Sequence, residues 1–313
     1  MKRYKLLNNV LGWVVFVIAA VTYILTLEST ASFWDCGEFI ASGYKLEVGH
    51  PPGNPIFMLT ARFFANFASS PSEVAYMVNL MSGLLSAATI LLLFWTITRL
   101  AQKIVLREGE TEETMSLGQM IAILGCGLVG ALAYAWSDTF WFSAVEGEVY
   151  AYSSFCTALV FWLILKWESV ADLPHANRYI ILIAYIIGVS IAVHLLNLLC
   201  IPAIVLVYYY RKYKNTDLKG SLIALLVSFV LIVLLLYGLV PGFVEVAGWV
   251  ELLFVNVFHL PFNSGVVFYF FLIVGVIAWA IYETYAQRSD KLIKISFLIS
   301  IVLVGIPFIG DGY

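Results

Sequence analysis

Charged residues are scarce in this sequence. Asp, Glu, Lys and Arg make up 12% of its 313 residues, about half of the roughly 25% found in a soluble domain. Hydrophobic residues make up 62%, so most of the chain must face lipid rather than water. An excess of positive charge is also lacking, since the formal net charge is -3. Nucleic acid is therefore not an expected partner, because its recognition relies on a basic surface.

Cysteine is sparse and follows no pattern. Cys126, Cys156 and Cys200 fall within apolar runs, where cysteine packs as a small buried side chain. Together with Cys36 they show no spacing typical of a disulfide framework or a zinc site. The apolar run that starts after Lys5 also lacks the small-residue cleavage site of a signal peptide, so we expect it to be retained as a first helix.

Long apolar runs are what the sequence has in quantity. A helix needs about 20 apolar residues to cross roughly 30 Å of hydrocarbon, and the sequence offers about nine such runs. We therefore predict an all-α polytopic membrane protein. The expected spans are 11–27, 74–98, 118–137, 149–166, 179–194, 196–210, 220–240, 265–282 and 292–309. The fifth and sixth are short and nearly continuous, and we divide them at His194-Leu195-Leu196-Asn197.

Lysine and arginine set the expected orientation, because they stay on the cytoplasmic side of short loops. With the N-terminus in the cytoplasm, every basic residue except Lys45 and Arg62 falls on an inner segment. These two exceptions lie in the first outer loop, residues 28–73. We expect a multi-pass protein of the cytoplasmic (inner) membrane, with this loop facing the periplasm.

A single transmembrane domain is expected over residues 1–313. The stretch from Pro241 to Gly265 is rich in Trp and Phe and sparse in charge, which suits a helix lying in the membrane interface. Because the chain stops as it leaves the ninth predicted span, we expect the natural protein to continue into a soluble C-terminal domain on the outer side.

An acidic pair stands in the first outer loop, where Asp35 and Glu38 are three residues apart in FWDCGEF. On a helix this spacing puts both carboxylates on one face. Like charges so placed repel each other unless a proton or a cation lies between them. A general base with a helper carboxylate and a pair holding a divalent ion both use this arrangement, whereas the simpler alternative is a solvated acidic patch.

A rigid turn follows in the sequence GHPPGNP. Its prolines and glycines constrain the backbone around His50 and Asn54, and Pro55 suits the first turn of a second interfacial helix. The turn is either a built site that fixes His50 or a plain connector. Lys45 and Arg62 flank it, so an anionic group on this face would rely on them, on helix N-termini or on a metal ion. Arg62 could equally extend to ordinary phospholipid.

Two further outer turns carry candidate site residues. Glu146 and Glu148 lie in a short turn near the membrane surface, where a buried carboxylate is costly, and Glu148 is the stronger candidate for a role in the site. His194 and Asn197 stand where a hydrophobic segment is broken, which often marks a binding cavity. The alternatives are a solvated turn for Glu148 and interhelical hydrogen bonds for the other pair. His259 is a weaker candidate.

These motifs resemble those of a known family. WDCGEF, followed by HPPGNP twelve residues after Glu38, resembles the membrane family called domain of unknown function 2723. That family is similar to the protein O-mannosyltransferases and to the wider GT-C glycosyltransferases, whose first outer loop carries an acidic pair and a later His-Pro-Pro or Lys-Pro-Pro turn. The layout is similar over the whole chain, but the specific motifs are confined to residues 33 to 55.

The resemblance implies a GT-C-type helical bundle that uses a polyprenyl-phosphate-linked sugar donor on the outer face. Asp35 then matches the catalytic base and Glu38 its acidic companion, although two residues separate them here and the mannosyltransferases have them adjacent. His50 matches the His-Pro-Pro turn, and Asn54 stands where the family often has Tyr. The expected donor-binding residues are His50, Lys45, Arg62, Asn54, His194 and Asn197.

We therefore expect a membrane glycosyltransferase that moves a sugar to an acceptor hydroxyl, such as a Ser or Thr of an exported protein. A divalent ion, Mg²⁺ or Mn²⁺, held by Asp35, Glu38 and Glu148 is a candidate cofactor. Two other functions stay open at this stage. One is a lipid-linked glycan carrier, which would need polar residues through several spans, and the other is a non-catalytic scaffold in an envelope complex.

Overall fold

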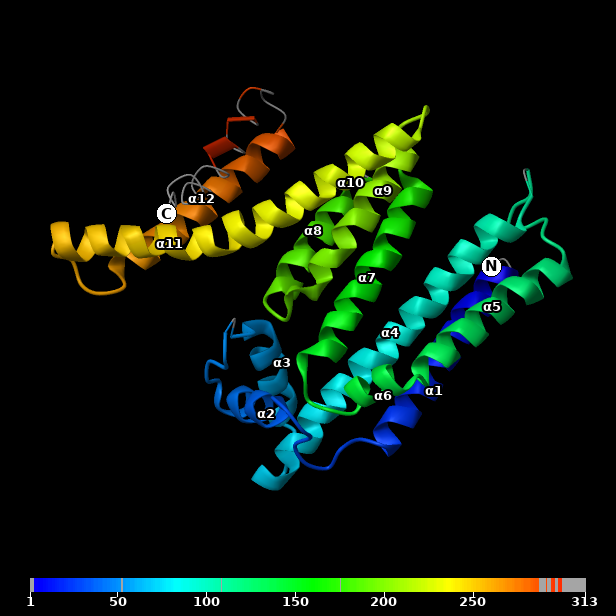
Figure 1. Ribbon diagram of the computed structural model, residues 1–313, viewed down its shortest axis with the longest axis horizontal. Coiled ribbons are helices and arrows are strands. Elements are labelled where there is room, and N and C mark those ends of the chain that lie inside the picture. Colours follow the sequence, from blue (N-terminus) through cyan, green and yellow to red (C-terminus); the bar gives the residue numbers. More distant parts are fainter. Residues whose placement is uncertain are drawn as a thin grey trace. The chain divides into compact units, whose positions relative to one another are not determined.

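The computed structural model describes residues 3–51, 53–107, 109–174, 176–286, 291, 294–295 and 298–299. Every regular element in this part of the chain is helical, as the sequence predicts (Figure 1). The α-helices are α1 (Arg3–Leu25), α2 (Cys36–Lys45), α3 (Pro55–Ala65), α4 (Val74–Val105), α5 (Leu117–Ala135), α6 (Asp138–Ala144), α7 (Val149–Val170), α8 (Arg178–Ile191), α9 (Ile201–Lys212), α10 (Leu218–Val233), α11 (Val240–Leu252) and α12 (Ser264–Ala286). Short 3₁₀ or π segments are η1 (Pro71–Glu73), η2 (Leu195–Cys200), η3 (Leu234–Leu239) and η4 (Leu253–Val257).

Seven helical segments of the described chain are long and apolar enough to cross a membrane, so the protein is a multi-pass membrane protein. They are Arg3–Leu25, Pro71–Val105, Leu117–Ala135, Val149–Val170, Leu195–Lys212, Leu218–Val257 and Ser264–Glu283. Each matches one of the predicted spans. The predicted fifth span corresponds to α8, which at 14 residues is shorter than a full crossing requires. The predicted ninth span, 292–309, lies almost wholly outside the described residues.

The predicted break in the chain between α8 and α9 is confirmed. Helix α8 ends at Ile191, and the 3₁₀ segment η2 separates it from α9. By contrast, the helix itself does not end at Pro241, where the predicted span ends, because one helical segment runs from Leu218 to Val257. The π segment η3 precedes Pro241, which then occupies the first turn of α11. A proline in a first turn breaks no hydrogen bond, and the wider π turn accommodates its ring.

The chain forms two compact units, residues 1–221 and 222–313. In the first unit, α4 is the central helix and packs against α1, α5 and α7. Tyr23 and Phe94 are fully buried between α1, α4 and α5. In the second unit, α11 packs against α12 around Val246 and Tyr269.

The first outer loop folds as the predicted helix-turn-helix. Phe39 of α2 and Phe57 of α3 are buried against Val78 of α4. The two short helices approach closely because Gly43 has no side chain, since a Cβ there would lie 2.7 Å from the Cβ of Ala61. This packing fixes α2, and with it the acidic pair, on one end of the first unit.

That end is the opposite one from most of the basic residues of the first unit. At the end of α2, Trp141 donates to Thr26 and the N–H of Glu28 donates to the carbonyl of Val145. At the other end, ion pairs join Lys5 to Glu112 and Lys103 to Glu168. The charged residues of these ion pairs and the acidic pair therefore lie at opposite ends of the first unit, whereas the orientation of the bundle in the membrane stays a prediction.

Candidate active site

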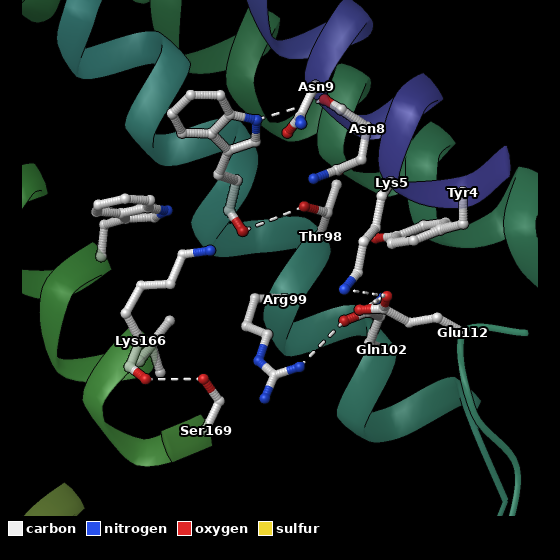
Figure 2. Close-up of a pocket in the computed structure, with 13 residues that line it drawn as sticks. Tyr4, Lys5, Asn8, Asn9, Thr98, Arg99, Gln102, Glu112, Lys166 and Ser169 are labelled. Carbon is white, nitrogen blue, oxygen red and sulfur yellow. Dashed lines mark hydrogen bonds and ion pairs between the residues drawn. The ribbon is translucent and has the colours of Figure 1, made fainter. Parts of the chain in front are cut away.

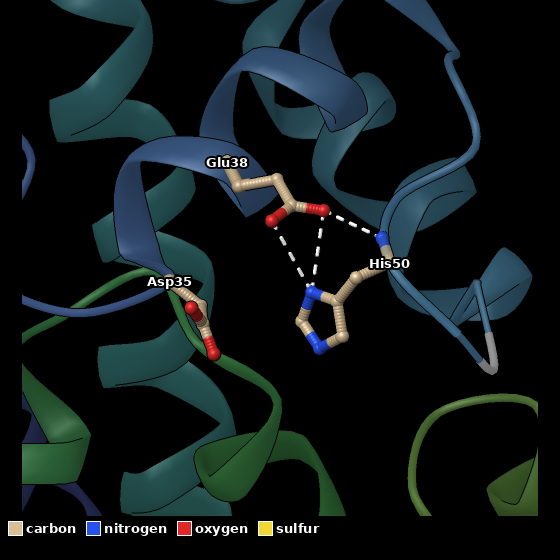
Figure 3. A group of neighbouring side chains, drawn as sticks. All are labelled: Asp35, Glu38 and His50. Carbon is tan, nitrogen blue, oxygen red and sulfur yellow. Dashed lines mark hydrogen bonds and ion pairs between the residues drawn. The ribbon is translucent and has the colours of Figure 1, made fainter.

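Three side chains of the first outer loop converge, one from the N-cap of α2, one from α2 and one from the proline turn. Their ligand atoms, one each from Asp35, Glu38 and His50, all lie within 4.8 Å of one another. Figure 3 shows the Glu38 carboxylate pointing toward the His50 ring, with the Asp35 carboxylate beside them at the start of α2. All three residues are exposed. The two carboxylates predicted from the sequence thus share a face with the predicted histidine.

Glu38 holds the turn that carries His50. Its Oε1 accepts a 2.6 Å hydrogen bond from the backbone N–H of His50, and His50 Nδ1 lies 3.2 Å from both carboxylate oxygens. These two contacts lower the pKa of Glu38 below its usual value, the backbone hydrogen bond most. An ionised Glu38 favours the tautomer with the proton on Nδ1, which leaves Nε2 free to accept a hydrogen bond. Gly49 allows the contact, since a Cβ there would lie 3.1 Å from Glu38 Oε1.

Asp35 begins α2 and is free to act on a ligand. It occupies the N-cap position, but its side chain does not cap the helix. The preceding Trp34 has a φ of 60° and a side chain that is 92% exposed. A large aromatic residue rarely adopts a positive φ, and strained backbone of this kind is frequent at functional sites. An exposed indole therefore stands beside the least constrained carboxylate of the group.

Glu148 lies outside this group of three but within electrostatic reach of Asp35. It precedes α7, is 7% exposed, and its Oε2 has no hydrogen-bond partner among the described residues. Burial raises its pKa to about 7, and the nearby Glu146 and Asp35 carboxylates contribute in the same direction. Near neutral pH Glu148 is therefore partly protonated.

Glu146 is a further buried carboxylate of the site, although Glu148 is the stronger candidate from the sequence. It is 5% exposed, interacts with Ser32 and the thiol of Cys36, and has a raised pKa, mainly through burial. Burial also raises the pKa of the Cys36 thiol to about 12, so this group stays protonated and can donate to Glu146. The signal in the sequence is the repeat of carboxylates in EGE next to an apolar helix.

Asn79 is a buried polar residue that the sequence reasoning missed. It is fully buried in α4, and its amide donates to the backbone carbonyls of Glu28 (2.7 Å) and Thr30 (3.1 Å). These hydrogen bonds hold the loop segment before Asp35 against the central helix α4. Gly147 passes so near that a Cβ there would lie 2.9 Å from Asn79 Oδ1. A lone Asn within an apolar span was the available signal.

The two outer cations are engaged elsewhere than at the acidic group. Lys45 lies 3.8 Å from Glu47 at the end of α2. Arg62 donates to the backbone carbonyl of Tyr44 and lies over the Tyr44 ring, 5.1 Å from its centroid. Arg62 therefore joins α3 to the C-terminus of α2. Asn54 occupies the N-cap position of α3 with a φ of 40°, but its side chain makes no capping bond. The residue is 3% exposed, and its Oδ1 has no partner among the described residues.

The remaining predicted donor-binding residues form part of the helical hairpin. Asn197 is fully buried; its amide donates to Ser190, and its Oδ1 faces Thr157 and the thiol of Cys200. This pattern is that of interhelical hydrogen bonds. His194 caps η2 by accepting from the N–H of Leu196, and burial lowers its pKa. The backbone N–H of Ile56 donates to the carbonyl of Ala192, so the hairpin also supports the first outer loop.

A cavity of about 620 Å³ begins beside this hairpin. It lies among α4, α5 and α7, and most of its exposed lining is apolar. Tyr150, whose ring centroid is 5.5 Å from that of His194, and Leu196 line one end, whereas Leu100 and Phe161 line it toward the other end of the bundle. Because Tyr150 follows Glu148 by two residues, the cavity adjoins the acidic site.

Comparison with known proteins agrees with the motifs. The sequence model of the family described as "Protein O-mannosyl-transferase TMEM260 N-terminal domain" matches residues 35–217, a range that includes Asp35, Glu38, His50 and Glu148. The chain is 27% identical to Protein O-mannosyl-transferase TMEM260 of Mus musculus over 209 residues, which are 67% of this chain and 27% of the relative. It is 23% identical to Protein O-mannosyl-transferase tmem260 of Dictyostelium discoideum over 189 residues, 58% of this chain and 20% of the relative.

The match covers only a part of these relatives, since the chain aligns with about a quarter of their length. No solved structure matches the chain. The family model nevertheless covers more than half of the 313 residues. The chain therefore belongs to the family of the Protein O-mannosyl-transferase TMEM260 N-terminal domain.

Proposed function

We propose that this protein is a GT-C-type glycosyltransferase that moves a mannosyl group from a polyprenyl-phosphate donor to a Ser or Thr hydroxyl of an exported protein. The observation that carries the proposal is the group of Asp35, Glu38 and His50 at one end of a lipid-embedded bundle, in a chain of this family. The mannosyl group and the protein acceptor come from the names of the relatives.

Asp35 is the proposed general base. Its carboxylate takes the proton of the acceptor hydroxyl, the hydroxyl oxygen forms a bond to the anomeric carbon, and the bond from that carbon to the phosphate oxygen breaks. The polyprenyl phosphate leaves with the bonding electron pair. Positioned proton transfer of this kind contributes about 10²–10⁴-fold to a rate. Asp35 suits the task because its side chain makes no capping bond to α2, whereas Glu38 is committed to His50.

The leaving phosphate needs positive charge, and the nearby cations supply little. Lys45 pairs with Glu47 and Arg62 with Tyr44, while Asp35, Glu38, Glu146 and Glu148 make the site acidic. His50, whose Nδ1 lies 3.2 Å from both Glu38 carboxylate oxygens, is one candidate as a hydrogen-bonding partner of the phosphate. A divalent cation is the other: two carboxylates and an imidazole within 4.8 Å are a fitting donor set, and the imidazole favours Mn²⁺ over Mg²⁺. The cation would neutralise charge on the phosphate oxygens.

The apolar cavity among α4, α5 and α7 is the proposed place of the polyprenyl chain. Its volume of about 620 Å³ and its apolar lining suit several isoprene units. Its end at Tyr150 lies next to His194 and Glu148, so a chain seated there would present its phosphate toward the acidic site. The acceptor would then approach from the water side, where Trp34 and Asp35 are exposed.

The test is a transfer assay with the purified protein in lipid nanodiscs, labelled polyprenyl-phosphate mannose and Ser/Thr-containing peptides. Asp35→Asn should reduce transfer by at least about 100-fold, as expected for loss of a general base. Asp138→Asn is the matched control, since Asp138 is an exposed carboxylate in α6 at the same end. Equal activity of the two variants would remove Asp35 from the chemistry.

The same assay separates the enzyme from the two alternatives. A non-catalytic scaffold transfers nothing from any polyprenyl-phosphate sugar, with or without Mn²⁺. A lipid-linked glycan carrier binds the donor in the cavity but leaves the sugar on the lipid. Either result, obtained with protein that is monodisperse and folded, would contradict the proposed transfer.

A further inference from the structure

A second polar cavity lies at the opposite end of the first unit from Asp35. It has a volume of about 530 Å³ and is formed by α1, α4, α7 and Glu112 of the connector between α4 and α5 (Figure 2). Its lining residues are Tyr4, Lys5, Asn8, Asn9, Trp95, Thr98, Arg99, Gln102, Glu112, Trp162, Leu165, Lys166 and Ser169. Most of these side chains are polar, although they stand at the ends of apolar helices.

The lining carries more positive than negative charge. Lys5, Arg99 and Lys166 are the cations and Glu112 is the only acidic member. Lys5 Nζ lies 3.5 Å from Glu112, which also accepts from Gln102 at 3.4 Å. One carboxylate inside the cavity is thus balanced by one lysine. Two cations remain for a ligand.

Arg99 and Lys166 are those two cations: Arg99 has one loose contact with a carboxylate, and Lys166 has none among the described residues. Arg99 Nη1 donates to Gln102 at 3.3 Å, and its Nη2 lies 3.8 Å from Glu168, a distance too long for a good hydrogen bond. Glu168 is held more closely by Lys103, at 2.7 Å. Lys166 Nζ lies over the Trp162 ring, 5.0 Å from its centroid, and no carboxylate pairs with it among the described residues. Figure 2 shows Arg99 and Lys166 on opposite sides of the cavity, on α4 and α7.

The cavity also offers a hydrogen-bond acceptor and an aromatic wall. The side-chain oxygen of Asn8 is buried and has no hydrogen-bond partner in the part of the chain that the structure describes, so a hydroxyl or ammonium donor of a ligand would satisfy it. Trp95 and Trp162 lie side by side, with ring centroids 5.8 Å apart. Tryptophan at a helix end is typical of the interface between lipid and water, where its ring contacts both.

From these features we infer that the cavity binds a phosphate-bearing headgroup that also carries hydroxyl or amine donors. Arg99 and Lys166 would bind the phosphate and Asn8 the donor, while the tryptophan rings would contact the glycerol and upper acyl chains of a lipid. A soluble phosphate ester shares this chemistry but leaves the rings without a partner, so a phospholipid of the leaflet at this end is the expected source. This site lies at the other end of the bundle from the proposed transfer and does not depend on it.

The experiment measures lipid that stays bound to the purified protein. Protein in nanodiscs that contain phosphatidylglycerol and phosphatidylcholine is transferred to mild detergent, and retained lipids are counted by native mass spectrometry. Arg99→Gln and Lys166→Gln should each lower the affinity for phosphatidylglycerol about tenfold, as loss of one charge-assisted hydrogen bond predicts. Lys214→Gln is the matched control, since Lys214 is an exposed lysine that follows α9 and does not line the cavity.

Two additional experiments identify the ligand and control for unfolding. Lys166→Arg keeps the positive charge, so it should bind phosphatidylglycerol more tightly than Lys166→Gln does. An unfolded variant would not bind it. Glycerol phosphate or inorganic phosphate, added to lipid-free protein, should stabilise it far less than phosphatidylglycerol does; equal stabilisation would contradict a lipid as the ligand. Retention of phosphatidylglycerol that is the same in Arg99→Gln, Lys166→Gln and Lys214→Gln would overturn the site altogether.

Discussion

The backbone N–H of His50 donates a 2.6 Å hydrogen bond to Glu38 Oε1 across twelve residues of sequence. The side chain of Glu38, in the first helix of the loop, therefore sets the conformation of the proline turn that follows. Because the same carboxylate faces His50 Nδ1, one residue fixes both the backbone position of the histidine and the direction of its ring. Asp35, three residues before Glu38, is left free for a ligand.

Replacing Glu38 should loosen the turn without unfolding the helices. In Glu38→Ala the N–H of His50 loses its acceptor, so we expect its hydrogen exchange to become faster, measured by mass spectrometry on peptides that cover 46–55. The lowered pKa of Glu38 gives the pH dependence. The charged form stabilises the fold above the ordinary Glu pKa, and this contribution is lost as pH falls through the lower folded value.

Glu47→Ala is the control for this prediction, because Glu47 is an exposed carboxylate of the same loop that pairs only with Lys45. Its exchange pattern around His50 should equal that of the unchanged protein. If Glu38→Ala also leaves the exchange of this segment unchanged at neutral pH, the contact between Glu38 and His50 does not hold the turn.

Glu148 should make stability depend on pH in the opposite sense. Burial raises its pKa from 4.5 to about 7, so between these values the folded state keeps a proton that the unfolded state has released. Stability is then highest below pH 4.5 and falls as pH rises through about 7. Glu148→Gln should lack this part of the pH dependence. The stability of the variant relative to that of the unchanged protein should therefore rise as pH increases from about 5 to about 8. Thermal unfolding midpoints in detergent measure it.

A transfer assay on Glu148→Gln tells whether the buried carboxylate also serves the reaction. If its proton matters only for folding, the pH profile of transfer is the same in the variant. If the transfer rate of the unchanged protein changes with pH near 7 and that of Glu148→Gln does not, the titration of Glu148 belongs to the catalytic cycle.

The local order of the site could be predicted from the sequence because it lies in short motifs. FWDCGEF predicts a helix with two carboxylates on one face, and the proline turn predicts a rigid position for His50; the structure has both. Long apolar runs predicted the spans for the same reason, since hydropathy and length decide them. Neither prediction required contacts between distant parts of the chain.

What the sequence could not reveal depends on contacts between elements. The sequence leaves open whether Arg62 faces an anionic group of a donor or ordinary phospholipid, and only the structure shows its hydrogen bond to the carbonyl of Tyr44 on the neighbouring helix. Asn79 lay within an apolar run, and only the fold shows that it holds the loop before Asp35. The helix continues past Pro241, where the predicted span ends, because a π segment before the proline accommodates it. Each of these outcomes depends on tertiary contacts or local backbone geometry that hydropathy does not encode.

Asn197 gives a prediction that separates packing from donor binding. Its side chain is fully buried and bonded to Ser190, so Asn197→Ala leaves that hydroxyl and the groups around Oδ1 without partners. We expect a loss of stability of about 1–3 kcal/mol, measured by denaturation in detergent, and an unchanged KM for the donor in the folded fraction. His194→Ala is the comparison, because His194 lies beside Tyr150 at one end of the cavity. A higher KM for the donor in Asn197→Ala but not in His194→Ala would support a direct contact between Asn197 and the donor.

The length of the donor chain offers the sharpest test of the apolar cavity. Ala158 of α7 lines it, and Phe at this position would occupy part of the volume that isoprene units are proposed to fill. Ala158→Phe should raise KM about tenfold for a long polyprenyl donor, equivalent to the loss of about 1.4 kcal/mol of binding, and should change KM little for a donor with one or two isoprene units. Val129→Phe is the control, because Val129 is 71% exposed on α5 and does not line the cavity. If Ala158→Phe raises KM equally for short and long donors, the chain does not lie among α4, α5 and α7, and the donor must reach Asp35 along another face of the bundle.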